Sequence, residues 1–94
     1  MGWPVIQQSI PRRHDILDPQ SYIWVIRPAV VSWLADQGIV LEPGWHSNLG
    51  VKVVPPRAGR VEFRFPPTGG AGNGVMCWND LDAKVAILFK LTWL

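Results

Sequence analysis

Residues 21–38 read SYIWVIRPAVVSWLADQG, and their apolar pattern changes from that of a β-strand to that of an α-helix. Residues 21–27 carry apolar side chains on both faces, which predicts a central strand covered on both sides. Pro28 suits the first turn of a helix, and Gly38 suits a cap about three turns later. A strand that leads directly into a helix indicates a protein that mixes both kinds of element.

A second region, residues 51–65, shows the pattern of a β-hairpin. Residues 51–54 are mostly apolar and are followed by two prolines, so we expect a strand that stops there. Residues 57–60 read RAGR and suit a chain reversal. Residues 61–65 then alternate apolar and polar side chains, which predicts a half-buried strand with one wet face.

The C-terminal region predicts a further strand and a second helix. Residues 75–78 are apolar and predict the strand, and Asn79 can cap the helix after it. Asp80 and Asp82 then fall in the first turn, where the helix dipole favours anions. Residues 91–94 are expected to form a last short strand. Four apolar residues at helical spacing predict the buried face of the helix: Leu81, Val85, Leu88 and Phe89.

These elements predict the α+β class, with a small antiparallel or mixed sheet of about four strands and two short helices. A ferredoxin-like arrangement is one candidate. We expect residues 21–94 to form a single domain. Residues 1–20 are expected to be an extended N-terminal arm, because prolines at 4, 11 and 19 interrupt any helical or strand period. Candidate contacts of this arm, with its own domain or a neighbour, are Trp3, Ile6, Arg12 and Arg13.

The composition suffices for one hydrophobic core without a metal or a disulfide. The chain has 94 residues, of which 48% are hydrophobic and six are Trp. Cys77 is the single cysteine, so no intramolecular disulfide can form. The formal net charge of +2 does not by itself indicate a nucleic-acid partner. We expect the core, rather than a base-stacking platform, to take up Trp24, Trp33, Trp78 and Trp93.

The sequence contains no pattern of a membrane or secreted protein. The longest apolar stretch, residues 23–35, is interrupted by Arg27 and Pro28 and is too short to span a bilayer. The N-terminal residues lack the basic and apolar regions of a signal peptide. We therefore expect a cytoplasmic protein without a membrane partner.

No motif for catalysis, metal binding or a cofactor is complete. Gly69 and Gly74 have the spacing of a phosphate-binding loop, but Val75 and Met76 stand where Lys and Ser or Thr are needed. Cys77 lies in an apolar strand, and nothing local joins it to a histidine as nucleophile and base. His14, His46 and Cys77 lack the spacing of metal ligands. We expect no catalytic residue, no metal and no cofactor, and hence not an enzyme.

A candidate binding surface lies in the basic hairpin of residues 52–64. Arginine can make bidentate contacts with carboxylates or phosphates. Trp45, in the polar turn region before the hairpin, could join the same surface. The cations of the hairpin are Lys52, Arg57, Arg60 and Arg64.

The C-terminal segment, residues 77–93, reads CWNDLDAKVAILFKLTW and resembles the ending of many small uncharacterised tailed-phage proteins. Those proteins close with a strand, a helix that starts with Asp-Ala, and a Phe-Lys-Leu-x-Trp sequence. Here the matching residues are Asp82 and Ala83, followed by residues 89–93. The chain differs from this pattern by several extra residues between Ala83 and Phe89. The resemblance implies a phage or mobile-element origin and no particular activity. If the protein is viral, we expect it in the host cytoplasm or in the virion.

Together these observations favour a non-enzymatic interaction protein, encoded by a phage. It would be either a small virion component or an inhibitor that binds a host protein. The abundant Trp and the apolar arm favour contacts with a protein partner or within a homo-oligomer, because interfaces are enriched in aromatic residues and Arg. The alternative is a nucleic-acid-binding module that uses the basic 52–64 hairpin.

Overall fold

A computed structural model describes residues 5–20, 23–44, 57–64 and 73–94 of the chain. Within these ranges the chain forms six strands, two α-helices and one short 3-10 helix. The elements follow in the order β1 (Val5–Ile10), β2 (Leu17–Gln20), β3 (Ile23–Ile26), α1 (Pro28–Asp36), β4 (Val40–Gly44), β5 (Arg60–Arg64), β6 (Gly74–Asn79), η1 (Asp80–Asp82) and α2 (Ala83–Trp93).

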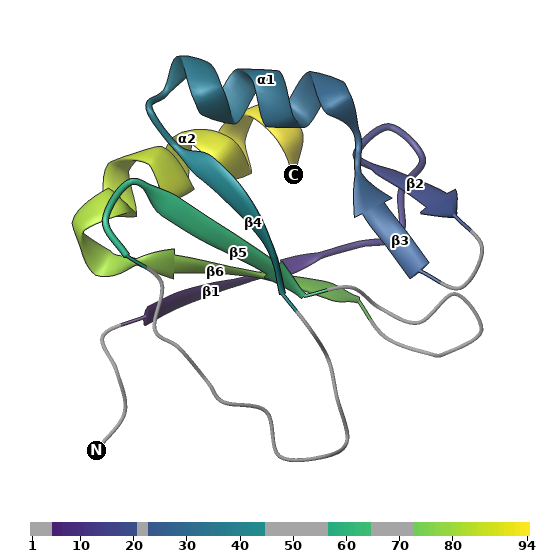
Figure 1. The fold of residues 1–94 in the computed structure, drawn as a ribbon, viewed down its shortest axis with the longest axis horizontal. Helices are drawn as coiled ribbons and strands as arrows, with labels where there is room; N and C mark the ends of the chain where they lie inside the picture. The colour runs from purple at the N-terminus through teal and green to yellow at the C-terminus, as the bar shows by residue number, and fades with distance from the viewer. Residues whose placement is uncertain (1–4, 21–22, 45–56, 65–72) are drawn as a thin grey trace.

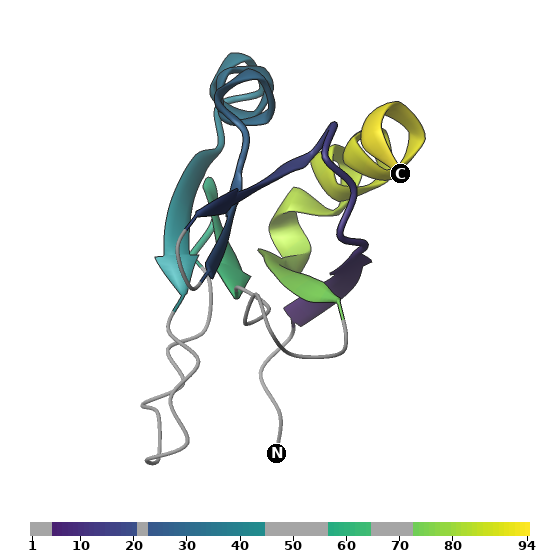
Figure 2. The same cartoon turned by 90° about the vertical axis from the view of Figure 1, so that its right-hand side faces the viewer.

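Four of the strands form a mixed sheet in the order β1-β6-β5-β4 (Figure 1). Strand β6 pairs antiparallel with β1 and β5, whereas β4 and β5 run parallel. Strands β2 and β3 form a separate antiparallel pair at one end of the molecule. Both helices lie on the same side of the four-stranded sheet, as the two views show (Figures 1 and 2). The predicted α+β class is confirmed, and the narrower ferredoxin-like topology stays a prediction.

Helix α1 begins and ends at the residues that the sequence indicates. Pro28 is its first residue. Gly38 adopts a φ of +77°, a backbone conformation that residues other than glycine rarely adopt. The Gly38 N–H donates to the Ala35 carbonyl, and the Ile39 N–H donates to the Leu34 carbonyl, both at 2.9 Å. These two bonds close the last turn in the way that a C-terminal glycine allows.

The start of the second helix is also as predicted, but its end is not. The Asn79 side chain accepts the Leu81 N–H at 2.9 Å and so caps η1, which leads into α2. Helix α2 then continues to Trp93, and the Leu94 N–H donates to the Lys90 carbonyl at 3.0 Å. The expected strand at residues 91–94 is therefore wrong, because the helix does not stop at Phe89 but adds one more turn.

The buried face of α2 also differs from the prediction. Ala86 and Phe89 are buried, and Val85 and Trp93 pack against the core. Two of the four predicted residues, Leu81 and Leu88, instead point away from the core and are exposed. The helix carries apolar residues on all sides, so its spacing alone could not show which side would face the sheet.

The centre of the core is an aromatic cluster that joins the sheet to both helices. Trp78 of β6 meets Phe89 of α2 at a ring-centroid distance of 5.7 Å. Trp33 of α1 meets Phe89 at 6.0 Å and Trp93 at 6.5 Å, again edge to face. Such geometries are preferred between aromatic rings. The predicted placement of the four tryptophans is confirmed: Trp78 is fully buried, and the partly buried ones pack against the core.

The N-terminal segment belongs to the domain and is not a separate arm. Strand β1 pairs with β6 along its whole length, from Val5 opposite Asn79 to Ile10 opposite Gly74. Ile10, Ile16 and Leu17 are fully buried in the core. The described residues 5–20 therefore lie on their own domain, one of the two places expected for the arm, but they form strands β1 and β2 of that domain and not a segment outside it. The segment consists of two short strands and a turn, so no regular alternation of apolar and polar residues runs through its whole length.

Strand β3 exists as predicted, but it is not a central strand, because it pairs with β2 in the smaller sheet. Strand β5 shows the predicted half-buried pattern, with Val61 and Phe63 buried. Its two neighbours are β4 and β6, so both of its edges are occupied. The prediction that β5 pairs with residues 51–54 in a hairpin is therefore wrong, because β4 and β6 take both of its edges. Residues 51–54 themselves lie outside the described residues.

Candidate functional site

Two of the arginines predicted to bind a partner are already paired with carboxylates. Arg60 donates from Nη1 to Glu42 Oε1 of the neighbouring strand β4. Arg64 donates from Nε to Glu62 Oε1 at 3.2 Å. The structure thus places both arginines on the outer face of the sheet, as expected, but each lies beside an anion. The net positive charge of this face is smaller than the sequence segment 52–64 suggested.

Arg57 lies on an exposed turn that is attached to the start of α2. Gly59, in the same turn, adopts a φ of +79° and donates its N–H to Asp82 Oδ2 at 2.8 Å. The Arg60 N–H donates to the Arg57 carbonyl at 3.0 Å, so residues 57–60 form a turn directly before β5. The turn therefore presents Arg57 near the N-terminal end of the helix. The other predicted members of this surface, Lys52 and Trp45, lie outside the described residues, as does Trp3.

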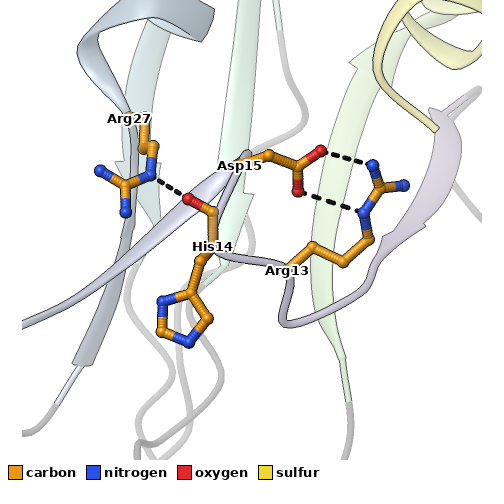
Figure 3. A network of polar contacts seen from close by, with 4 residues as sticks. All are labelled: Arg13, His14, Asp15 and Arg27. Carbon is orange, nitrogen blue, oxygen red and sulfur yellow. Dashed lines mark hydrogen bonds and ion pairs between the residues drawn. The ribbon is translucent and has the colours of Figure 1, made fainter.

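The remaining residues predicted as arm contacts hold the fold together locally. Ile6 is partly buried and packs on the core, and Arg12 is half-buried. Arg13 donates two hydrogen bonds to Asp15 across the turn between β1 and β2 (Figure 3). These bonds lower the pKa of the Asp15 carboxyl below its ordinary value. This exposed pair contributes little to stability.

The same turn is tied to the end of β3. The Arg27 guanidinium donates from Nε to the carbonyl oxygen of His14 (Figure 3). Its Nη2 also lies 3.9 Å from Asp18 Oδ1. The His14 ring meets Trp24 edge to face at 5.4 Å. Arg13 and Arg27 thus hold the turn between β1 and β2 in place beside the β2–β3 pair.

Cys77 has the surroundings of a structural residue. It is only 1% exposed and lies on β6 opposite Gln7 of β1 and Glu62 of β5. Burial raises the pKa of the Cys77 thiol, so the unreactive protonated form dominates at neutral pH. Among the described residues, no three His, Cys, Asp or Glu side chains gather where they could hold a metal ion.

The least expected surface is an apolar one on the outside of the second helix. We call it the α2 stripe. Leu81 is 78% exposed, Ile87 60% and Leu91 79%, values far from those of the buried core. Lys84 and Lys90 are exposed on the same helix. The α2 stripe consists of Leu81, Ile87, Leu88, Leu91 and Leu94.

Sequence reasoning missed the α2 stripe although a signal was present. Leu81, Lys84, Leu88 and Leu91 follow each other at spacings of three and four residues, which places them on one side of a helix. The inward residues Val85, Ala86 and Phe89 occupy the other side. A surface helix normally carries polar residues opposite its core face. A helix that is apolar on both sides indicates a second contact surface.

In the part of the chain that the structure describes, neither helix is long and apolar enough to cross a membrane. No protein-family model, no curated protein and no solved structure matches the chain.

Proposed function

We propose that the protein is a non-enzymatic interaction protein that binds another protein through the α2 stripe. The observation that carries this proposal is the exposure of five large aliphatic side chains along a single helix, its 3-10 start and the residue that ends it. Isolated exposed apolar residues are normal on any protein surface. Several of them along the side of one helix that faces away from the core are typical of a protein contact, since water disfavours apolar surface that nothing covers.

The charge pattern of the sheet supports a protein partner over a nucleic acid. A nucleic-acid-binding surface needs cations that are free to meet phosphates. Arg60 and Arg64 lie beside Glu42 and Glu62, whose carboxylates would repel a phosphate backbone. The assignment to a tailed phage, as a virion component or as an inhibitor of a host protein, is part of the proposal and rests on the resemblance of residues 77–93.

The test replaces the centre of the α2 stripe with polar residues that favour a helix. Ile87→Gln/Leu91→Gln keeps the helix propensity and leaves the core face untouched. We expect this variant to remain folded and to show less self-association, or less binding of cellular proteins, than the unchanged chain. Sedimentation velocity measures the first, and quantitative affinity purification measures the second. Val40→Thr is the matched control, because Val40 is 57% exposed but lies on the edge strand β4.

Two results would contradict the proposal. One is binding by the Gln variant that equals that of the unchanged chain. The other is tight, salt-dependent binding to an oligonucleotide that the Gln variant retains, which would favour the nucleic-acid alternative.

A further inference from the structure

The two lysines of α2 differ from four of the described arginines, which lie beside aspartates or glutamates. Among the described residues, the ion pairs join Arg13, Arg27, Arg60 and Arg64 to aspartates or glutamates. Neither Lys84 nor Lys90 takes part in any of them, and both are exposed. The positive charge that the fold does not neutralise therefore includes these two ammonium groups on the helix that carries the α2 stripe.

The positions of the lysines place them within and beside the apolar row. Lys84 precedes Leu88 by four residues and follows Leu81 by three, so it lies in line with the stripe. Lys90 follows Ile87 by three residues and precedes Leu94 by four, so it lies at the margin of the stripe. Residues 83–94 contain no Asp or Glu. The exposed face of α2 is therefore apolar and cationic, with Arg57 on the turn that Asp82 holds at the start of the helix.

This charge pattern disfavours a second copy of the same helix as the occupant. In an antiparallel pair centred between Ile87 and Leu88, Lys84 of one copy lies opposite Leu91 of the other, so both Lys84 ammonium groups enter an apolar contact. In a parallel pair in register, each lysine lies beside its own equivalent. In both arrangements the facing helix offers these lysines no carboxylate as the apolar surfaces close, which opposes association.

We propose that the occupant of the α2 stripe is an acidic amphipathic helix of another protein, with an apolar row flanked by carboxylates. Its apolar row packs on the α2 stripe, and its Glu or Asp side chains pair with Lys84 and Lys90. Helix-in-groove and helix-on-helix docking use apolar anchors at such spacings. Complementary charges along the margins select the partner and its direction. This inference rests on the proposed function, because it names the partner of the same surface.

The test uses two synthetic peptides with the same apolar row over about three heptads. One carries Glu and the other carries Lys at the flanking positions. Fluorescence anisotropy of the labelled peptides measures the dissociation constant for the full chain at low and at high salt. We expect the Glu peptide to bind roughly tenfold more tightly at low salt, and the difference to shrink at high salt because charges are screened.

The charge-reversed variant Lys84→Glu/Lys90→Glu should prefer the Lys peptide instead. Arg13→Glu/Arg64→Glu is the control, because it changes the net charge by the same amount at positions outside α2. It should keep the preference for the Glu peptide. Circular dichroism checks that both variants fold.

The outcomes separate this inference from the proposed function. If both peptides bind equally and Ile87→Gln/Leu91→Gln abolishes binding, the stripe is a contact surface but its partner is not selected by acidic charge, which overturns the inference alone. If neither peptide binds while the unchanged chain self-associates through the stripe, a second copy is the occupant and the inference is again wrong. A preference that reverses in the Lys84→Glu/Lys90→Glu variant supports it.

Discussion

The Gln8 side chain accepts the indole N–H of Trp78 at 2.8 Å. The Gln8 amide nitrogen in turn donates to the carbonyl oxygen of Ala86 in α2 at 2.7 Å. One polar side chain on an outer strand of the sheet therefore satisfies the single donor of the fully buried Trp78 and connects β1, β6 and α2. A buried donor without a partner would be costly in free energy, which gives this glutamine a defined structural role.

Gln8→Met should lower the free energy of unfolding by about 1–3 kcal/mol. Methionine has a similar size, but it leaves the Trp78 indole N–H and one helix carbonyl without the side-chain partner. Urea denaturation measures the loss. Gln7→Met, on the exposed neighbouring residue, should change the stability by only about 0.5 kcal/mol. Equal effects of the two substitutions would show that the hydrogen bonds of Gln8 do not matter for stability.

Ile10→Ala should lower the free energy of unfolding by roughly 2–5 kcal/mol. Ile10 is fully buried at the end of β1, so the shorter side chain leaves a cavity in the core. Gln20→Ala, at an exposed residue of β2, is the control and should be nearly neutral. Chemical denaturation of both variants gives the comparison. A neutral Ile10→Ala would mean that the N-terminal segment is an arm after all.

The stability of the protein should fall as the pH rises through about 8.5, the pKa of the thiol of an unfolded cysteine. Burial raises the pKa of Cys77 in the folded state, so the folded thiol keeps its proton at a pH where the unfolded one has lost it. The unfolded state then binds fewer protons, and the free energy of unfolding decreases with pH. The contribution is fully present at lower pH and is lost between the unfolded and the folded pKa.

Cys77→Ala should remove this part of the alkaline dependence. The difference between the two pH profiles isolates the thiol from other groups that titrate at high pH. In the native state Cys77 should also react slowly with thiol reagents at neutral pH, because the side chain is buried and protonated. Rapid labelling of the native protein, or identical pH profiles for both chains, would disprove the structural role.

The attachment of the Arg57 turn to α2 should depend on the Asp82 carboxylate. Asp82→Ala removes the acceptor of the Gly59 N–H and should cost roughly 1.5–3 kcal/mol, the range for a hydrogen bond to a charged group. Asp82→Asn keeps an oxygen acceptor and should cost less. Thermal and chemical unfolding of the two variants provide the measurement. If Ala and Asn had the same effect, the hydrogen bond would not be what holds the turn.

Part of the candidate site could be predicted from the sequence, and part depends on strand pairing. The alternation of residues 61–64 correctly predicted that Arg64 lies on the wet face of β5. It could not predict that Glu42 would lie beside Arg60, because strand β4 is far away along the chain and its parallel pairing with β5 depends on the whole sheet. Basic residues close in sequence indicated a binding surface, whereas tertiary pairing decided which cations have partners.

Local chemistry by itself determined the elements whose signals lie within a few residues. Pro28 and Gly38 marked the ends of α1, and Asn79 marked the start of the second helix. These signals depend on backbone conformation and on hydrogen bonds to near neighbours, so they act before any distant contact forms. The α+β class followed from the same local patterns.

Only the tertiary structure decided where these elements pack. It placed β1 beside β6, gave β5 its two neighbours, and turned Phe89 rather than Leu88 toward Trp78. Strand pairing and the choice of a helix face depend on contacts between residues far apart in sequence, which no short window contains. In α2, where both sides are apolar, burial of one side in the core left the other side as the exposed α2 stripe.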